Sequence, residues 1–214
     1  MTYKIRDILL DNKVRIRNQE ELDTRRHEFL EVCKILDNLK IRYFLLGGVL
    51  LGAIRNNDFI AWDWDVEICV YSDEVIKKIG PLLSMIDASE FSIIKYNKKL
   101  SEFKIDLLGK FPKEVTKYTI MGWNYNKKKR IFWRKTLKIP EHFLNNMSKI
   151  ELFNKLHFAP YPPKEYLAHQ YGDWQKPMQT SNKKKYLTKK YYGRNILSKI
   201  INKVSNFIKR SLKK

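Results

Sequence analysis

The stretch that decides the fold is Phe59–Tyr71, which reads FIAWDWDVEICVY. Side chains alternate between two faces on an extended chain, so Asp63, Asp65 and Glu67 are expected to point to the same side. The opposite side would then carry Trp62, Trp64, Val66 and Ile68. This pattern predicts a strand that is buried on its apolar face and presents a cluster of carboxylates on the other.

The carboxylate cluster predicts a metal site. Three carboxylates this close together repel one another, and keeping them ionised in a partly buried place is costly. A divalent cation removes the conflict. Oxygen ligands, in a chain with only four histidines, suit Mg²⁺ or Mn²⁺ better than zinc. The alternative interpretation is an edge strand whose acidic face is simply solvated.

A further carboxylate, Asp106, stands alone in the apolar segment Phe103–Leu108. On a strand beside the first cluster, Asp106 would complete the metal-binding group. The alternative is an ordinary strand residue with no part in chemistry.

A glycine pair precedes the acidic strand. Gly47 and Gly48 separate the strand-like run Ile41–Leu46 from VLLGAIR, which is expected to be helical. A strand, two glycines and a helix start place backbone N–H groups and a helix N-terminus near any bound anion. Arg55, one to two turns into that helix, either binds a phosphate or lies solvated on the surface.

The remaining chain mixes helices and strands. Hydrophobic spacing predicts helices over residues 20–40 and 73–85, strands over 91–96 and 103–108, and a short helix after the prolines at 160–163. Residues 116–138 are irregular and receive no assignment. The order of strand, Gly-Gly, helix, Asp-x-Asp strand and later Asp strand matches the nucleotidyltransferase fold. We therefore expect an α/β (α+β) fold, with a small mixed sheet flanked by helices.

Composition sets the broad class. A chain of 214 residues with 43% hydrophobic and 31% charged residues is long enough for one folded domain with its own core. Its two cysteines, Cys33 and Cys69, exclude a disulfide scaffold and read as core residues. Apolar runs fall short of the ~20 residues that span a bilayer. A cytoplasmic protein is the expectation, with a catalytic domain over residues 1–190.

The formal net charge of +20 is concentrated near the C-terminus. Residues 174–214 hold 13 Lys and Arg and no acid, and residues 195–213 are expected to form an amphipathic, basic helix. Such a helix fits an anionic membrane surface, so residues 191–214 are interpreted as a tail that keeps the protein on the inner face of the cell membrane. The alternatives are packing against the domain or against a second subunit in an oligomer. Nucleic acid is the least favoured partner.

Three stretches resemble the LicD family, which includes fukutin and the fukutin-related protein. They are Phe44–Val70, the KIDLL segment around Asp106, and Pro160–Trp174, which reads PYPPKEYLAHQYGDW. Two positions depart from the family pattern. Ala61 stands where a proline is usual, and Glu67 replaces the usual third Asp, so Glu67 is a direct ligand, a ligand through water, or a base.

The resemblance implies a phosphotransferase. Such an enzyme moves a phospho-alcohol or phospho-alditol group, for example phosphocholine, from a CDP-activated donor to a sugar hydroxyl of a surface polysaccharide or its lipid-linked precursor. Asp63 and Asp65 would bind Mg²⁺ (or Mn²⁺), and Asp106 would act near the acceptor hydroxyl as ligand or general base. Gly47, Gly48 and Arg55 would bind the donor diphosphate. Tyr171, Asp173 and Trp174 would either shape the donor pocket or pack in a purely structural role.

Two other functions remain open at this stage. The same fold and acids would serve a nucleotidyltransferase that moves a nucleoside monophosphate to RNA or a small molecule. A non-enzymatic, basic binding module is the third interpretation, and the intact acids Asp63, Asp65 and Asp106 count against it.

Overall fold

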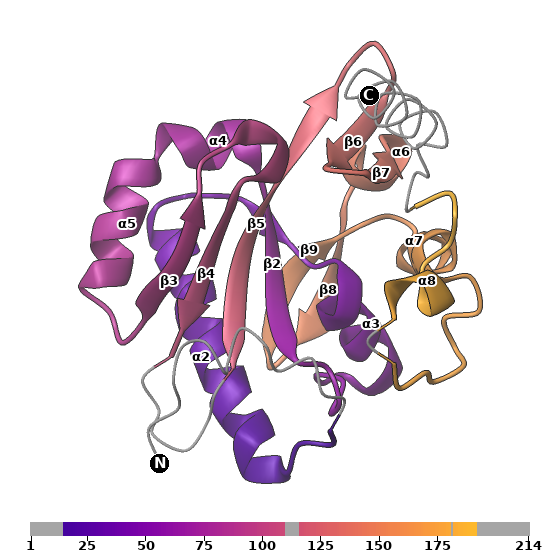
Figure 1. Cartoon of the computed structure of the whole chain (residues 1–214), viewed down its shortest axis with the longest axis horizontal. Helices are drawn as coiled ribbons and strands as arrows, with labels where there is room; N and C mark the ends of the chain where they lie inside the picture. The colour runs from indigo at the N-terminus through magenta and orange to yellow at the C-terminus, as the bar shows by residue number, and fades with distance from the viewer. Residues whose placement is uncertain (1–14, 110–115, 181, 192–214) are drawn as a thin grey trace, which may run out of the picture.

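A computed structural model describes residues 15–109, 116–180 and 182–191. Its centre is a mixed nine-stranded sheet, in which the main path runs β3-β4-β5-β2-β1-β9-β8 and β6 and β7 extend from β5 (Figure 1). The strands are β1 (Tyr43–Phe44), β2 (Asp65–Tyr71), β3 (Ser92–Asn97), β4 (Lys104–Leu108), β5 (Lys117–Asn126), β6 (Ile131–Arg134), β7 (Leu137–Pro140), β8 (Ser148–Leu152) and β9 (Lys155–Ala159). The expected mixed α/β class is confirmed, with a larger sheet than the small one anticipated.

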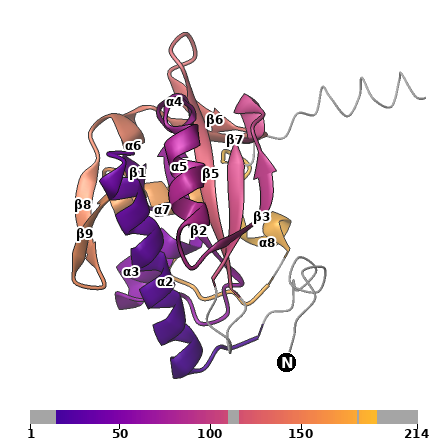
Figure 2. The same ribbon diagram turned by 90° about the vertical axis from the view of Figure 1, so that its left-hand side faces the viewer.

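Helices cover the sheet. They are α2 (Gln19–Asn38), α3 (Gly47–Asn56), α4 (Ser72–Lys77), α5 (Ile79–Asp87), α6 (His142–Asn145), α7 (Pro163–Tyr171) and α8 (Lys183–Tyr186), with a 3₁₀ turn at η1 (Leu100–Glu102). Helices α2 and α5 contact each other: in Figure 1, α2 passes behind β3 and β4 and α5 lies to the left of β3, and Figure 2 shows the same pair from the side. Helices α3 and α7 contact each other beside β2, where the candidate site lies.

Strand β2 lies in the middle of the sheet. It pairs in parallel with β5, where Glu67 lies opposite Thr119, and antiparallel with β1. Val66, Ile68 and Val70 on β2 are fully buried, so one face of the strand contributes to the hydrophobic core. Asp65 and Glu67 therefore face the candidate site from a strand whose backbone is paired with β5 along its whole length and with β1 at Cys69 and Val70.

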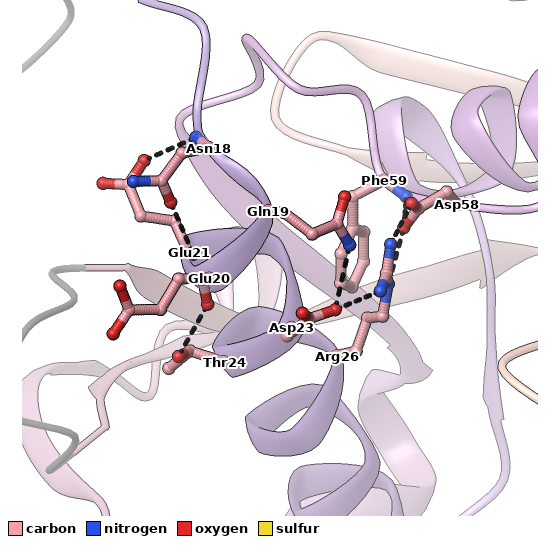
Figure 3. A network of polar contacts seen from close by, with 9 residues as sticks. All are labelled: Asn18, Gln19, Glu20, Glu21, Asp23, Thr24, Arg26, Asp58 and Phe59. Atoms are coloured by element: carbon pink, nitrogen blue, oxygen red, sulfur yellow. Dashed lines mark hydrogen bonds and ion pairs between the residues drawn. The ribbon is translucent and has the colours of Figure 1, made fainter.

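Helix α2 begins with a capping box (Figure 3). The Asn18 side chain accepts a hydrogen bond from the Glu21 amide at 2.9 Å, and the Glu21 carboxylate accepts one from the Asn18 amide at 3.2 Å. Two turns on, Arg26 donates through Nε to Asp58 at 3.0 Å, and the Asp58 carboxylate also accepts from the Phe59 amide. This network ties α2 to the loop that leads from α3 into the acidic segment.

Several predicted elements are confirmed and others need correction. The helix predicted over residues 20–40 is α2, and DVEICVY is β2. The single helix predicted over 73–85 is instead α4 and α5, broken at Lys78, because Pro81 has no backbone N–H and fits only in the first turn of a helix. Residues 116–138, which received no assignment, contain β5, β6 and the start of β7.

Strand β5 also changes the position of the later acidic strand. We expected Asp106 on a strand beside the first carboxylate cluster, but β5 lies between β4 and β2. The strand β5 was not predicted because its buried residues include Lys117, Thr119 and Gly122, which break the apolar pattern of a central strand.

The predicted basic helix at 195–213 lies outside the described residues, as does most of the proposed tail at 191–214. Its membrane, packing and oligomer interpretations stay predictions, as does the domain boundary at residue 190. Within the described ranges, the helices are all too short or too polar to cross a bilayer.

Candidate active site

A cavity of about 450 Å³ opens between β2, the start of α3 and the segment that follows α7. The residues that line it include six of the predicted site residues: Gly47, Gly48, Arg55, Asp63, Asp65 and Glu67. Structure therefore brings together the glycine turn and the acidic segment, which are separated by about 15 residues in the sequence.

The glycine turn contacts the carboxylates directly. Gly47 has φ +60°, a conformation that side chains disfavour, and begins α3 directly after the extended residue Leu46. A Cβ on Gly47 would lie 3.2 Å from Oε2 of Glu67, and a Cβ on Gly48 would lie 1.8 Å from Oδ2 of Asp63. Leu46 provides no side-chain cap, so the first N–H groups of α3 lie beside the carboxylates without a capping side chain.

Asp63 lies in a turn just before the strand. Its amide donates to the Ile60 carbonyl at 2.9 Å, and β2 begins only at Asp65. The alternation of side chains therefore does not extend back through Trp62 and Trp64, and both indoles line the cavity with the acids instead of facing away from them. The prediction that the two tryptophans point to the opposite side is wrong for this reason.

The acids interact strongly. The pKa of Asp63 is raised to about 7, mainly by burial and also by the charges of Asp65 and Glu67, against the lowering effect of the charge of Arg25 and a hydrogen bond from the Trp64 amide. Arg25 is fully buried on α2 and donates to the Asp63 carbonyl at 2.8 Å. The acidic cluster thus lies beside a fully buried arginine of α2.

Asp106 lies deeper and outside this cavity. Only 1% of its surface is exposed, and its carboxylate accepts hydrogen bonds from Lys104 at 2.6 Å and from Thr119 at 2.7 Å. Burial alone would raise the pKa of Asp106, but these hydrogen bonds and the charge of Lys117 lower it. In the described part of the chain, Asp106 does not line the cavity wall.

Lys117 links Asp106 to the acidic cluster. Its Nζ lies 3.4 Å from Oδ2 of Asp65 and 4.0 Å from Oδ1 of Asp106, and it stands 4.1 Å from the centre of the Trp64 ring. The structure therefore connects Asp106 to Asp65 through a lysine on the intervening strand. The assignment of Asp106 as a metal ligand or base stays a prediction.

Arg55 is held by the segment after α7. Its guanidinium donates to the carbonyls of Trp174 and Lys176, the latter at 3.1 Å, and it lines the cavity. Asp173 also lies close enough for its charge to act on Arg55. Arg55 thus ties α3 to the cavity wall, and its binding of a donor diphosphate stays a prediction.

Aromatic side chains close the cavity from the C-terminal side. Tyr171, Trp174 and Tyr186 line it, and the rings of Tyr171 and Tyr186 lie 6.1 Å apart. Burial raises the pKa of Tyr186, and the charges of Asp63, Glu67 and Asp65 raise it further. Tyr186 therefore faces the carboxylates.

Sequence reasoning missed several cavity residues. They are Arg134, Gln170, Tyr186 and Tyr191, together with Lys117 behind Asp65. Arg134 and Lys117 lie in the stretch that received no assignment. Gln170 lies in the PYPPKEYLAHQYGDW segment but received no role there, and Tyr186 and Tyr191 follow that segment without any motif. A lone arginine in the aromatic run IFWR was the only sign in the sequence that could have pointed to Arg134.

The acids fit a cation that takes part of its ligands from substrate. Across residues 15–109, 116–180 and 182–191, no three His, Cys, Asp or Glu side chains form a complete metal site. Mg²⁺ is usually held by one or two carboxylates together with water and substrate phosphates, so Asp63 and Asp65 suit it and an all-protein zinc cage is disfavoured. The pKa of Asp63 is raised first by burial and then by the charges of Asp65 and Glu67, and a bound cation would offset both effects.

Comparison with known proteins identifies the protein family. A family model described as "LicD/FKTN/FKRP, nucleotidyltransferase domain" matches residues 40–162, which include the glycine turn, the acidic strand and Asp106. The chain belongs to this LicD/FKTN/FKRP family. The resemblance found in the sequence motifs is therefore confirmed.

Two kinds of relative are similar over different lengths. The ribitol 5-phosphate transferases FKRP of Mus musculus and of Homo sapiens are each 26% identical over 157 residues, covering 66% of this chain and 30% of the relative. The lipopolysaccharide cholinephosphotransferase LicD of Haemophilus influenzae is 41% identical over 58 residues, covering 24% of this chain and 22% of the relative. The matched region thus spans less than a third of each of these proteins.

A solved structure of ANT(2")-Ia in complex with adenylyl-2"-tobramycin is also similar. Its TM-score is 0.45 at 8% sequence identity, with 64% of this chain and 69% of that chain covered.

Proposed function

We propose that this protein is a phosphotransferase that moves a phospho-alcohol or phospho-alditol group from a CDP-activated donor to a sugar hydroxyl. The acceptor would be a cell-surface polysaccharide or its lipid-linked precursor. Support comes from the family and from the named activities of its relatives, which transfer ribitol 5-phosphate and choline phosphate.

One observation carries the proposal: Asp63 and Glu67 lie against the two glycines that begin α3. A phosphate in this place would meet the backbone N–H groups of the first helical turn on one side and the carboxylates on the other. Carboxylates alone would repel it. The arrangement therefore suits a phosphate that arrives with a cation.

Asp63 and Asp65 are the residues that would hold Mg²⁺ or Mn²⁺. When bound, the cation would neutralise the donor phosphates and polarise the phosphorus–oxygen bond under attack. The raised pKa of Asp63 is in keeping with this role, because a nearby positive charge would restore the ionised form.

The chain's own residues would position the reactants. In the proposed step, the sugar hydroxyl oxygen forms a bond to the phosphorus of the head group, the bond to the bridging oxygen breaks, and CMP leaves with that oxygen. Glu67 lines the cavity beside the glycine turn and would accept the hydroxyl proton. Lys117 would hold Asp65 in place from behind.

Product analysis tests the proposal. The protein would be incubated with MgCl₂, a glycan acceptor and a panel of CDP-choline, CDP-ethanolamine, CDP-glycerol, CDP-ribitol, CTP and ATP. We expect CMP from at least one CDP donor and no pyrophosphate from the nucleoside triphosphates. Pyrophosphate release coupled to a modified acceptor would instead support the nucleotidyltransferase alternative.

Matched variants sharpen this assay. Asp65→Asn should abolish CMP formation, whereas Asp87→Asn should not, because Asp87 is exposed at the end of α5, away from the cavity. Full activity of Asp65→Asn would contradict the assigned metal ligand.

A further inference from the structure

A second polar cluster lies in the same cavity, further along β2 than the carboxylates. Arg134 on β6 and Gln170 on α7 line this end, and aromatic side chains of Trp123 and Tyr191 form its walls, with their ring centres 6.4 Å apart. Cys69 marks the place on β2, two residues beyond Glu67, or roughly 7 Å along an extended strand. Arg134, Trp123 and Tyr191 lie outside the motifs that predicted the acidic site, and Gln170 and Cys69 lie in motif stretches that gave them no part in substrate binding.

Arg134 is buried without a compensating acid. Only 6% of its surface is exposed, its Nε has no hydrogen-bond partner, and the described residues offer its guanidinium neither a hydrogen bond nor an ion pair. A guanidinium stays ionised in a protein, so removing it from water without a partner is costly. The buried and unpaired guanidinium of Arg134 therefore indicates a binding partner from outside the chain.

Gln170, in contrast to Arg134, lacks a hydrogen-bond donor. It is 4% exposed, and its Oε1 is buried with no hydrogen-bond donor within reach. An amide oxygen can only accept, so its missing partner is an O–H or N–H group. At this end of the cavity, Arg134 therefore lacks an anionic partner and Oε1 of Gln170 lacks a hydrogen-bond donor.

We propose that Arg134 and Gln170 form a second substrate subsite, in which Arg134 binds a phosphate or carboxylate group and Gln170 accepts a hydrogen bond from a neighbouring hydroxyl or amine of the same ligand. A guanidinium can meet two oxygens of such an anion at once. The ligand class is a hydroxylated or aminated anion, of which a phosphate ester of a polyol is the example that fits both groups.

Inorganic phosphate is the probe for Arg134. Thermal unfolding of the whole protein would be followed in phosphate and in sodium chloride of equal ionic strength, for wild type, Arg134→Met, Arg134→Lys and Arg130→Met. Arg130 is the matched control because it lies on the same β5–β6 hairpin but is exposed and pairs with Glu141. Phosphate bound at the start of α3 would affect all four proteins equally, so the difference between the two methionine variants isolates Arg134.

We expect Arg134→Met to bind phosphate at least about tenfold more weakly than Arg130→Met, and Arg134→Lys to fall between them. In phosphate-free buffer, Arg134→Met should be as stable as wild type or more stable, because an unpaired buried charge has been removed. The proposal is overturned if Arg134→Met unfolds at a lower temperature in phosphate-free buffer while its response to phosphate is unchanged. Equal responses of the two methionine variants would overturn it as well.

Glycerol 3-phosphate tests Gln170. Replacing Gln170 with Leu should weaken binding of glycerol 3-phosphate and leave binding of inorganic phosphate unchanged, because only the former brings a carbon-linked hydroxyl to Oε1. An equal loss with both probes would contradict the hydrogen bond assigned to this oxygen.

Steady-state kinetics then identifies which substrate carries the anion, a step that rests on the proposed function. A higher KM of Arg134→Met for the CDP donor alone would place a donor phosphate at Arg134, and a higher KM for the acceptor alone would place an anionic group of the acceptor there. If no CDP donor is turned over, the proposed function fails, whereas the phosphate difference between Arg134→Met and Arg130→Met still decides the subsite.

Discussion

The Cβ atom that Gly48 lacks would lie 1.8 Å from Oδ2 of Asp63. No side chain fits between the helix start and this carboxylate, so the missing Cβ allows Asp63 to lie against the first turn of α3. The contact couples two motifs that the sequence keeps apart, and it makes the glycine a determinant of carboxylate position.

Gly48→Ala should therefore impair the site without unfolding the protein. Gly48 does not have a positive φ, so alanine fits the helix backbone, but the Asp63 carboxylate must move by more than about 1 Å to reach ordinary contact distance. A misplacement of this size costs roughly 100-fold in turnover. Turnover of the CDP donor and Mn²⁺ binding by electron paramagnetic resonance would both measure the loss.

Gly80→Ala is the control for this variant, because a Cβ on Gly80 in α5 meets no atom within 4 Å. It should keep full activity and gain a little stability, since alanine favours helix by up to ~1 kcal/mol over glycine. Wild-type Mn²⁺ affinity in Gly48→Ala would contradict the positional role of the glycine.

Asp106→Asn should lower stability far more than Asp65→Asn does. Asp106 is buried and bonded to Lys104 and Thr119, so loss of its charge leaves Lys104 without its acid and leaves Lys117 with Asp65 alone. Breaking a buried ion pair costs about 3–5 kcal/mol. Chemical denaturation of both variants would show the difference, and an Asp106→Asn protein as stable as wild type would exclude the structural role.

Arg55→Met should loosen the cavity wall after α7. The guanidinium of Arg55 bonds to the carbonyls of Trp174 and Lys176, and methionine cannot donate either hydrogen bond. Hydrogen exchange measured by mass spectrometry should then speed up in peptides covering 172–178. The control is Arg42→Met, which removes an exposed arginine that pairs with Glu74 and should leave exchange in those peptides unchanged. Equal exchange rates in the two variants would contradict the role of Arg55 in holding the segment after α7.

His157 should make the fold sensitive to mild acid. Burial lowers the pKa of His157 below 6.5, although the hydrogen bond between Nε2 and the Leu152 carbonyl, 3.2 Å long, acts in the opposite direction. Its Nδ1 is buried without a partner. The unfolded chain then binds more protons between that lowered pKa and 6.5. The free energy of unfolding is therefore highest above pH 6.5 and falls as pH drops through this window, by at most ~1.4 kcal/mol per pH unit.

His157→Gln should flatten this dependence while keeping the donor to Leu152. The exposed His27 gives the control, since His27→Gln leaves the buried ring in place. Urea denaturation at pH 5, 6 and 7 measures the slope. An unchanged slope in His157→Gln would assign the acid sensitivity to another group.

The amino-acid sequence by itself determined the parts of the site that depend on residues close together in the chain. Backbone geometry over a few residues determines the strand-to-helix turn at Gly47-Gly48 and the start of the strand near Asp63 and Asp65. Hydrophobic spacing over twenty residues determines the helix α2. The same stretches carried the family resemblance. These features could be predicted because each is local.

Only the tertiary structure decided which of these residues meet and what lies between them. The parallel pairing of β5 with β2 inserts Lys117 and Thr119 between Asp106 and the acidic cluster, and long-range pairing of this kind leaves no mark in local sequence. Arg134 reaches the cavity for a similar reason, because the β5–β6 hairpin folds back toward α7. The sequence supplied an acidic strand and a phosphate turn, and the packing of distant strands made them one cavity with an acidic and a basic end.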